Sequence, residues 1–223
     1  MSSERIEFFF DPMCPWAYQT SKWFREVRER VGFEVSWRFF SLEEINLVVG
    51  KKHPWERPWS YGWSQMRVAA WIRRDSQEAV GRWYEAAGEA FHERGVKTHD
   101  PDIHRELVSR IGFPGAVDAA LADPTTADEV RADHEEAVSL HGAFGVPTIV
   151  LECGHAVFGP VVTPAPTGDA ALRLWDLVVG WREFPHLYEM RHPKTTADVS
   201  HIAESFRPYL TARDWATIEN PAP

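Results

Sequence analysis

The segment FFFDPMCPW most constrains the fold, because an apolar run ends in Asp11-Pro12 and a lone cysteine, Cys14, stands directly before a proline. Apolar and aromatic residues at 5–10 predict a strand that stops at Asp-Pro. Pro15 fits the first turn of a helix, where a missing N–H group costs nothing. The sequence therefore places the thiol between the end of a strand and the start of a helix.

A second strand follows this helix after a short connection. From residue 15 to about 31, apolar residues recur at three- and four-residue steps and predict a helix with one buried face. Gly32 is a suitable stop, and residues 33–40 alternate as in a strand. The order is β-α-β with short joins, which favours two parallel strands.

A helical block separates this unit from the rest of the chain. Helices are predicted over residues 64–74, 76–94, 101–111, 114–121 and 126–141. Strand character then returns at 148–151 and 155–158, with Cys153-Gly154 at the turn of a hairpin, and residues 167–181 predict a helix. Without the block, this order of elements is that of a thioredoxin-like core.

We therefore predict an α/β protein with a thioredoxin-like fold and an inserted all-helical subdomain. The core is predicted to comprise residues 1–41 and 142–193, the insertion residues 42–141, and a C-terminal extension residues 194–223. The extension has weak periodicity and is expected to wrap the surface or a partner subunit, so a homodimer is left open.

Composition narrows the function and the partners. The formal charge is −9 without a long basic block, which disfavours nucleic acid as a partner. No apolar stretch approaches the roughly 20 residues of a membrane helix, and the N-terminal segment lacks the features of a signal peptide. Only two cysteines occur, which fits a reducing compartment. A cytoplasmic location without membrane association is the expectation.

The position of Cys14 predicts a reactive thiol. Unpaired N–H groups and the helix dipole favour an anion at a helix start. A thiol placed there can have its pKa lowered from about 8.5 to roughly 3.5–7.5, which makes the nucleophilic thiolate available. The alternative is that Cys14 is simply a small buried hydrophobic residue.

The segment GVPT, residues 145–148, gives a second signal. Pro147 stands at the very start of a predicted strand, where it cannot donate to the ladder. A cis bond between Val146 and Pro147 would let Val146 pair with an extended ligand that carries sulfur. An ordinary trans proline is far more common, and only the combination with Cys14 favours the cis form.

The segments FFFDPMCPWAYQTSKWFREV and FGVPTIVLECGHAVFGPVV resemble the DsbA-like branch of the thioredoxin superfamily. They are most similar to actinobacterial mycothiol-dependent oxidoreductases of the DPxCPWC type, as are LWDLVVGWREFPHLYEMRH and the helical block. The resemblance implies that Cys14 is the attacking thiol and Pro147 the cis-proline beside it. It also implies a small thiol co-substrate, mycothiol or glutathione, no tightly bound cofactor, and an electrophilic or disulfide acceptor.

Ala17 stands where such proteins usually carry the second cysteine, which resolves a mixed disulfide by attacking the first. The chain is therefore predicted to be a monothiol oxidoreductase or reductase. Two alternatives stay open. One is a transferase or isomerase of the kappa type, a group that characteristically has serine at this place. The other is a binding module without redox activity.

The remaining site residues are predicted because they lie within or next to the two motifs, the Cys14 segment and GVPT. Contacts to the substrate or the small thiol are expected from Asp11, Pro15, Trp16, Val146 and Thr148. The ten histidines show no HExxH pattern and no paired Cys/His spacing, so no metal site is predicted.

Overall fold

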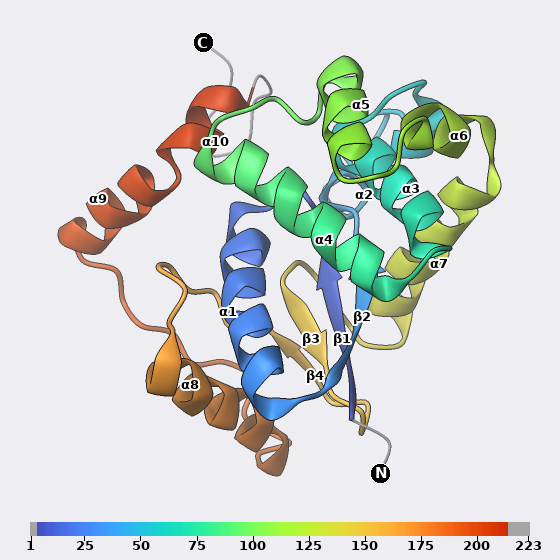
Figure 1. The fold of residues 1–223 in the computed structure, drawn as a ribbon. Helices are drawn as coiled ribbons and strands as arrows, with labels where there is room; N and C mark the ends of the chain where they lie inside the picture. The colour runs from blue at the N-terminus through green and yellow to red at the C-terminus, as the bar shows by residue number, and fades with distance from the viewer. Residues whose placement is uncertain (1–3, 214–223) are drawn as a thin grey trace.

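The computed structural model describes residues 4–213, and its centre is a four-stranded sheet in the order β2-β1-β3-β4 (Figure 1). Strand β1 (Arg5–Phe10) pairs in parallel with β2 (Glu34–Phe39). Strand β3 (Thr148–Val150) is antiparallel to β1, and β4 (Ala156–Phe158) is antiparallel to β3. The predicted parallel pair and the hairpin are both present.

Helix α1 (Pro15–Val31) connects the two parallel strands and packs on one face of the sheet. Its Phe24 ring lies 4.9 Å from Phe8 and 6.2 Å from Trp37. All three side chains are almost completely buried. Burying one such aromatic side chain contributes about 1.5–3 kcal/mol, so this cluster fixes the helix on the sheet.

Helix α8 (Gly168–Gly180) lies beside α1 and completes this layer (Figure 1). The Trp23 indole N–H donates to the carbonyl of Ala171 at 2.9 Å. The Trp175 ring stacks on Phe33 at 5.0 Å. The predicted helix at 167–181 is thus present and packs through its apolar face.

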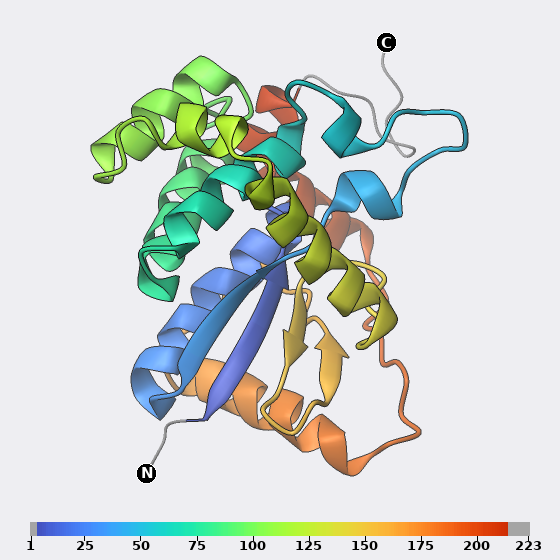
Figure 2. The same ribbon diagram turned by 90° about the vertical axis from the view of Figure 1, so that its right-hand side faces the viewer.

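The block between β2 and β3 is helical, as predicted. It contains α2 (Leu42–Ile45), a 3₁₀ turn (Pro54–Glu56), α3 (Tyr61–Arg73), α4 (Gln77–Gly88), a π-helical turn (Glu89–Glu93), α5 (Pro101–Arg110), α6 (Ala116–Ala122) and α7 (Thr125–Ser139). Helices α4 and α7 pack against β2, and one continuous apolar core joins the block to the sheet (Figure 2). The fold is therefore thioredoxin-like with a helical insertion.

Two of the predicted helices differ at their ends. Helix α3 begins three residues earlier than predicted, because the Glu43 carboxylate accepts from the N–H groups of Gly62 and Trp63 in its first turn. The predicted helix at 76–94 changes to π geometry after Gly88. A Cβ atom at Gly88 would lie 2.2 Å from Tyr18 Cδ2, so only glycine lets the helix approach this ring.

The tail forms two helices that its weak periodicity did not predict. Helix α9 (Thr196–Ser205) starts with a capping box between Thr195 and Asp198. Helix α10 (Arg207–Ala212) follows it and packs against the π-helical turn. Figure 1 shows α10 beside the end of α1 at which that helix begins.

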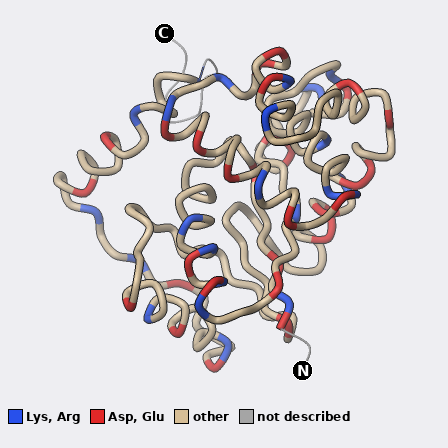
Figure 3. Tube along the Cα trace, in the orientation of Figure 1, with Lys and Arg blue, Asp and Glu red and all other residues tan. Residues whose placement is uncertain are grey.

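Charged residues of both signs are intermingled along the described chain (Figure 3). Among residues 4–213, no helix combines the length and the apolar character that crossing a bilayer requires.

Candidate active site

Cys14 is the N-cap residue of α1 and has an extended backbone. Its N–H donates to the carbonyl of Asp11 at 3.0 Å, which closes the turn after β1. Its Sγ atom accepts from the Ala17 N–H at 3.4 Å. The residue is 6% exposed, so the thiol sits at the helix start as predicted but is covered.

The loop before β3 brings Val146 and Pro147 beside this thiol. The peptide bond between them is cis, and the Val146 carbonyl oxygen lies 3.6 Å from Cys14 Sγ. Thr148 is not directed into the same contact, because its hydroxyl donates to the carbonyl of Gly145 at 2.8 Å. The structure thus brings Cys14, Val146 and Pro147 together, whereas the Thr148 side chain supports the loop.

The prediction that the Cys14 pKa is lowered is wrong for this structure, in which the thiol is covered; we call this arrangement the closed form of the site. Burial raises the pKa of the thiol to about 12, and the nearby Asp11 carboxylate raises it as well. The Ala17 N–H acts in the opposite direction. Loss of water around the sulfur outweighs the favourable helix start, so Cys14 is a neutral thiol at pH 7 in this arrangement.

Asp11 does not cap α1, a role that falls to Cys14. Its Oδ1 accepts from the Met13 N–H at 2.9 Å and its Oδ2 from the Leu42 N–H at 2.8 Å. The side chain is 1% exposed, and burial raises its pKa to about 7 despite these two hydrogen bonds. Asp11 therefore links the thiol turn to the helical insertion and titrates near neutral pH.

The C-terminal helices cover the thiol turn, which sequence reasoning missed. The Phe206 ring meets Trp16 edge-on at 4.7 Å. Tyr209 lies 5.5 Å from the Phe91 ring, and Ala212 packs with Met13 and Phe91. Trp16 and Pro15 are half-buried at the edge of this contact. Two signals in the sequence were the Thr195 and Asp198 spacing, which is that of a capping box, and the aromatic residues Phe206 and Tyr209 in a tail of weak periodicity.

His92 and Tyr84 also belong to the surroundings of the thiol turn and were not predicted. His92 Nε2 lies 2.9 Å from the carbonyl oxygen of Pro12, and its ring stacks on Tyr18. Burial lowers the pKa of His92 to about 4, so it is neutral at pH 7. The pKa of Tyr84 is raised well above its usual range, mainly by burial and next by the charge of the nearby Cys14 sulfur. Both residues occupy ordinary core positions of helical segments, which periodicity alone cannot separate from site positions.

No second thiol of residues 4–213 reaches Cys14 in this structure. Ala17 is completely buried one turn along α1. Cys153 is an exposed free thiol in the turn between β3 and β4. Because Val150 pairs with Glu7 while Cys14 follows the other end of β1, the two thiols lie at opposite ends of the sheet. That strand's six residues span roughly 20 Å.

Opening the C-terminal cover should make Cys14 reactive. In a Cys153→Ser background, the double substitution Phe206→Ala and Tyr209→Ala removes two aromatic rings that cover the thiol turn. Since burial is the main cause of the raised pKa, each unit by which the pKa falls gives about tenfold more thiolate. We expect the rate of alkylation by iodoacetamide at pH 7.5 to rise about tenfold or more.

The matched control is Leu210→Ala, because Leu210 lies on the same helix and is 42% exposed. Its alkylation rate should equal that of the background. An unchanged rate in the double variant would show that α10 does not control access to the thiol.

Comparisons with known proteins agree with this geometry. The fold and the thiol site define a DsbA-like protein of the thioredoxin superfamily. The family model described as Rv2466c-like, mycothiol-dependent nitroreductase Rv2466c, matches residues 13–192, and the chain belongs to this family. The uncharacterized protein Rv2286c of Mycobacterium tuberculosis is 54% identical over 214 residues, which cover 96% of this chain and 92% of that protein.

Solved structures share the fold at low identity. The probable DsbA oxidoreductase SCO1869 of Streptomyces coelicolor has a TM-score of 0.56 and 21% identity, with 86% of this chain and 93% of that chain covered. The cytosolic disulfide reductase DsbM of Pseudomonas aeruginosa, solved with GSH, has a TM-score of 0.54 and 15% identity, with 79% and 99% covered. These likenesses support the fold, and the family adds a thiol-dependent redox function.

Proposed function

We propose that this protein is a monothiol oxidoreductase in which Cys14 forms and releases a mixed disulfide with a small thiol, mycothiol being favoured by the family. The observation that carries the proposal is the contact of Cys14 Sγ with the start of α1 and with the Val146 carbonyl, while alanine occupies position 17. Pro15 and Trp16 border the thiol, and Val146 and Pro147 provide the opposite side.

The proposed cycle has two exchange steps. The Cys14 thiolate attacks one sulfur of a disulfide RSSR, forms a Cys14–SR mixed disulfide and expels RS⁻. A second small thiolate R′S⁻ then attacks the SR sulfur, gives RSSR′ and restores the Cys14 thiolate. With Ala17 in place of a cysteine, the second thiol has to come from solution.

The buried, neutral thiol of the closed form implies that the first step follows an opening of the site. A neutral thiol is a poor nucleophile, and the sulfur is covered. In the open form, water reaches the sulfur while the Ala17 N–H stays in place, so the pKa falls. We propose that α10 is the element that moves, because Phe206 and Tyr209 cover the thiol turn.

The test is formation of the adduct, followed by intact-protein mass spectrometry after incubation with oxidised mycothiol, oxidised glutathione or oxidised bacillithiol. Cys153→Ser, which lacks the exposed second thiol, should gain one thiol moiety at Cys14, fastest with the physiological thiol. Cys14→Ser should gain none in a Cys153→Ser background. Adding the reduced thiol should remove the adduct.

Two other outcomes would replace this proposal. A Cys14→Ser variant that retains most of the turnover of a thiol-dependent conjugation would indicate the transferase or isomerase alternative. A wild-type protein that forms no adduct with any of the three disulfides, yet binds a small thiol, would indicate a binding module.

A further inference from the structure

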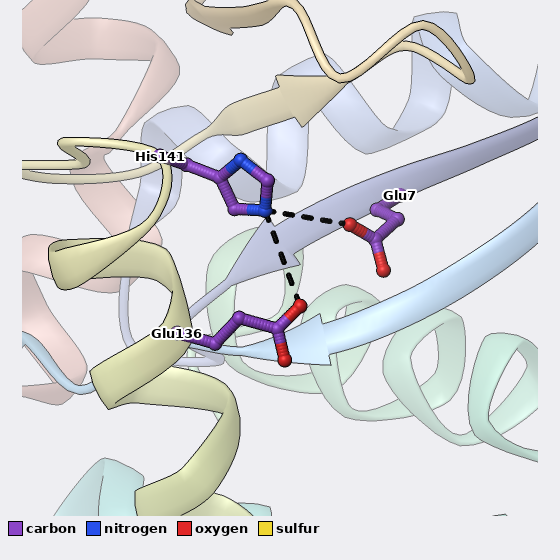
Figure 4. A group of neighbouring side chains, drawn as sticks. All are labelled: Glu7, Glu136 and His141. Carbon is purple, nitrogen blue, oxygen red and sulfur yellow. Dashed lines mark ion pairs between the residues drawn. The ribbon is translucent and has the colours of Figure 1, made fainter.

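A cluster of Glu7, Glu136 and His141 lies on the sheet away from the thiol, and the proposed cycle does not use it (Figure 4). Glu7 belongs to β1, Glu136 to the last turn of α7, and His141 to the segment that follows α7. Figure 4 shows the two carboxylates converging on one ring nitrogen of the histidine. His141 Nε2 lies 3.8 Å from Glu7 Oε2 and 4.0 Å from Glu136 Oε1.

The histidine nitrogen is buried and has no hydrogen-bond partner. The His141 side chain is 9% exposed, and its Nε2 atom is shielded from solvent with no donor or acceptor within hydrogen-bond distance. A buried polar nitrogen without a partner costs about 1–3 kcal/mol. The nitrogen therefore faces two carboxylate oxygens across a gap that is too wide for a hydrogen bond.

Arg38 holds the two carboxylates but leaves this gap open. Its guanidinium group donates to Glu7 Oε1 at 2.9 Å and also to Glu136 Oε2. Each carboxylate thus uses one oxygen for Arg38 and turns the other toward His141. Arg38 and Arg73 also pair with Asp133, and Arg73 pairs with Glu129 as well. Four carboxylates therefore face these two guanidinium groups, and the cluster keeps a negative balance.

We propose that Glu7, Glu136 and His141 bind a divalent transition-metal ion, with Zn²⁺ the best fit. One imidazole nitrogen and two carboxylate oxygens form a typical donor set, with metal–ligand distances of about 2.0–2.2 Å. Two ligands of a tetrahedral ion lie about 3.3 Å apart. His141 Nε2 therefore has to approach Glu7 Oε2 by about 0.5 Å and Glu136 Oε1 by about 0.7 Å, and all three ligand atoms already lie within 4.8 Å of one another. The glutamate side chains are 22% and 38% exposed, which gives the ion access and leaves a position for water.

The ion would join β1 to the segment that leads from α7 to Val146. Its role is to stabilise this connection, because none of its ligands contacts Cys14. The site was not predicted from the sequence, since Glu7 is distant from the other two ligands in the chain and the spacing of Glu136 and His141 matches no metal-binding motif.

The test uses the full chain with Cys14→Ser and Cys153→Ser, which removes both thiols as competing ligands, after treatment with EDTA. Calorimetric titration with Zn²⁺ should give one ion per chain, and Co²⁺ should give the visible absorption of a tetrahedral site. Bound ion should also raise the temperature of unfolding. Loss of a residue that only hydrogen-bonds to a metal ligand typically weakens metal binding by roughly 10–100-fold. His141→Gln and Glu136→Gln each remove a ligand itself, so each should weaken Zn²⁺ binding by more than this.

His53→Gln is the matched control, because His53 lies at 2.9 Å and 3.1 Å from the two oxygens of the single carboxylate of Glu44. Its Zn²⁺ affinity should equal that of the parent. Absence of stoichiometric binding to the parent, or equal affinity in His141→Gln, would overturn the proposal. Far-UV spectra that match that of the parent would show that all three variants, His141→Gln, Glu136→Gln and His53→Gln, keep the fold.

Discussion

Ala17→Cys is expected to convert the proposed monothiol cycle into a dithiol cycle. The Ala17 amide nitrogen already lies 3.4 Å from Cys14 Sγ, and the new sulfur would be three bonds from this nitrogen. A thiolate at position 17 can attack the Cys14 sulfur of a mixed disulfide, form an intramolecular disulfide and expel RS⁻. The adduct should then disappear without added thiol, at least about 100-fold faster than in the parent, because the attack becomes intramolecular.

The measurement is the lifetime of the Cys14 adduct by rapid quenching and intact mass, in a Cys153→Ser background. Ala17→Ser is the matched control, since it adds an atom of similar size at the same buried position without a nucleophile for sulfur. Its adduct should persist as in the parent. Persistence of the adduct in Ala17→Cys would mean that position 17 cannot reach the sulfur once the mixed disulfide has formed.

The β-α-β unit and the placement of Cys14 could be predicted because each depends on neighbouring residues. The apolar run up to Phe10, the stop at Asp11-Pro12 and proline in the first helical turn act within one short segment. The helices of the insertion and the hairpin could be predicted for the same reason. These elements agree with the structure to within a few residues, apart from the π-helical turn after Gly88.

The state of the thiol could not be predicted, because it depends on segments that are distant in the sequence. The helix start favours an anion, but the chain folds Phe206 and Tyr209 from the tail over the same turn. The tail has weak periodicity, so its helices follow from tertiary packing rather than from a strong local pattern. The same limit applies to the approach of Glu7 on β1 to His141, because these two residues lie far apart in the sequence.

Asp11→Asn is expected to remove a large penalty that the folded protein carries above pH 7. The pKa of Asp11 is about 7 in the folded chain, whereas an aspartate in an unfolded chain has a pKa of 3.8. Between these values the folded state keeps the proton and the unfolded state has lost it, so this group lowers stability as pH rises from about 4 to 7. The difference of about three pKa units corresponds to about 4 kcal/mol.

Asparagine, like the protonated form of Asp11, carries no charge at this buried position. Its side-chain oxygen can accept from one of the two amides, Met13 or Leu42, but its NH2 group cannot accept from the other, so one hydrogen bond is lost. The variant should therefore be less stable than wild type near pH 4.5, by about 1–3 kcal/mol for the lost hydrogen bond. Its stability relative to wild type should then rise by a few kcal/mol between pH 4.5 and pH 8. The pKa of Cys14 should also fall, since the Asp11 charge is one cause of its rise. Alkylation of Cys14 at pH 8 should accordingly be faster.

The measurement is urea unfolding of both proteins from pH 4.5 to 8.5, read as the difference between the two stability curves. The difference is needed because two buried histidines also make stability depend on pH. Burial lowers the pKa of His92 and of His104 to about 4, so both lower the stability of the protein as pH falls below 6.5, whereas Asp11 lowers it as pH rises. These histidines are common to both proteins and cancel. Asp102→Asn, at an exposed side chain of α5, controls for the change in net charge. A stability difference that stays constant across this pH range would show that Asp11 is already ionised in the folded protein at pH 4.5. Burial and the constant charge of Asp11 would then be the two causes of the raised pKa of Cys14.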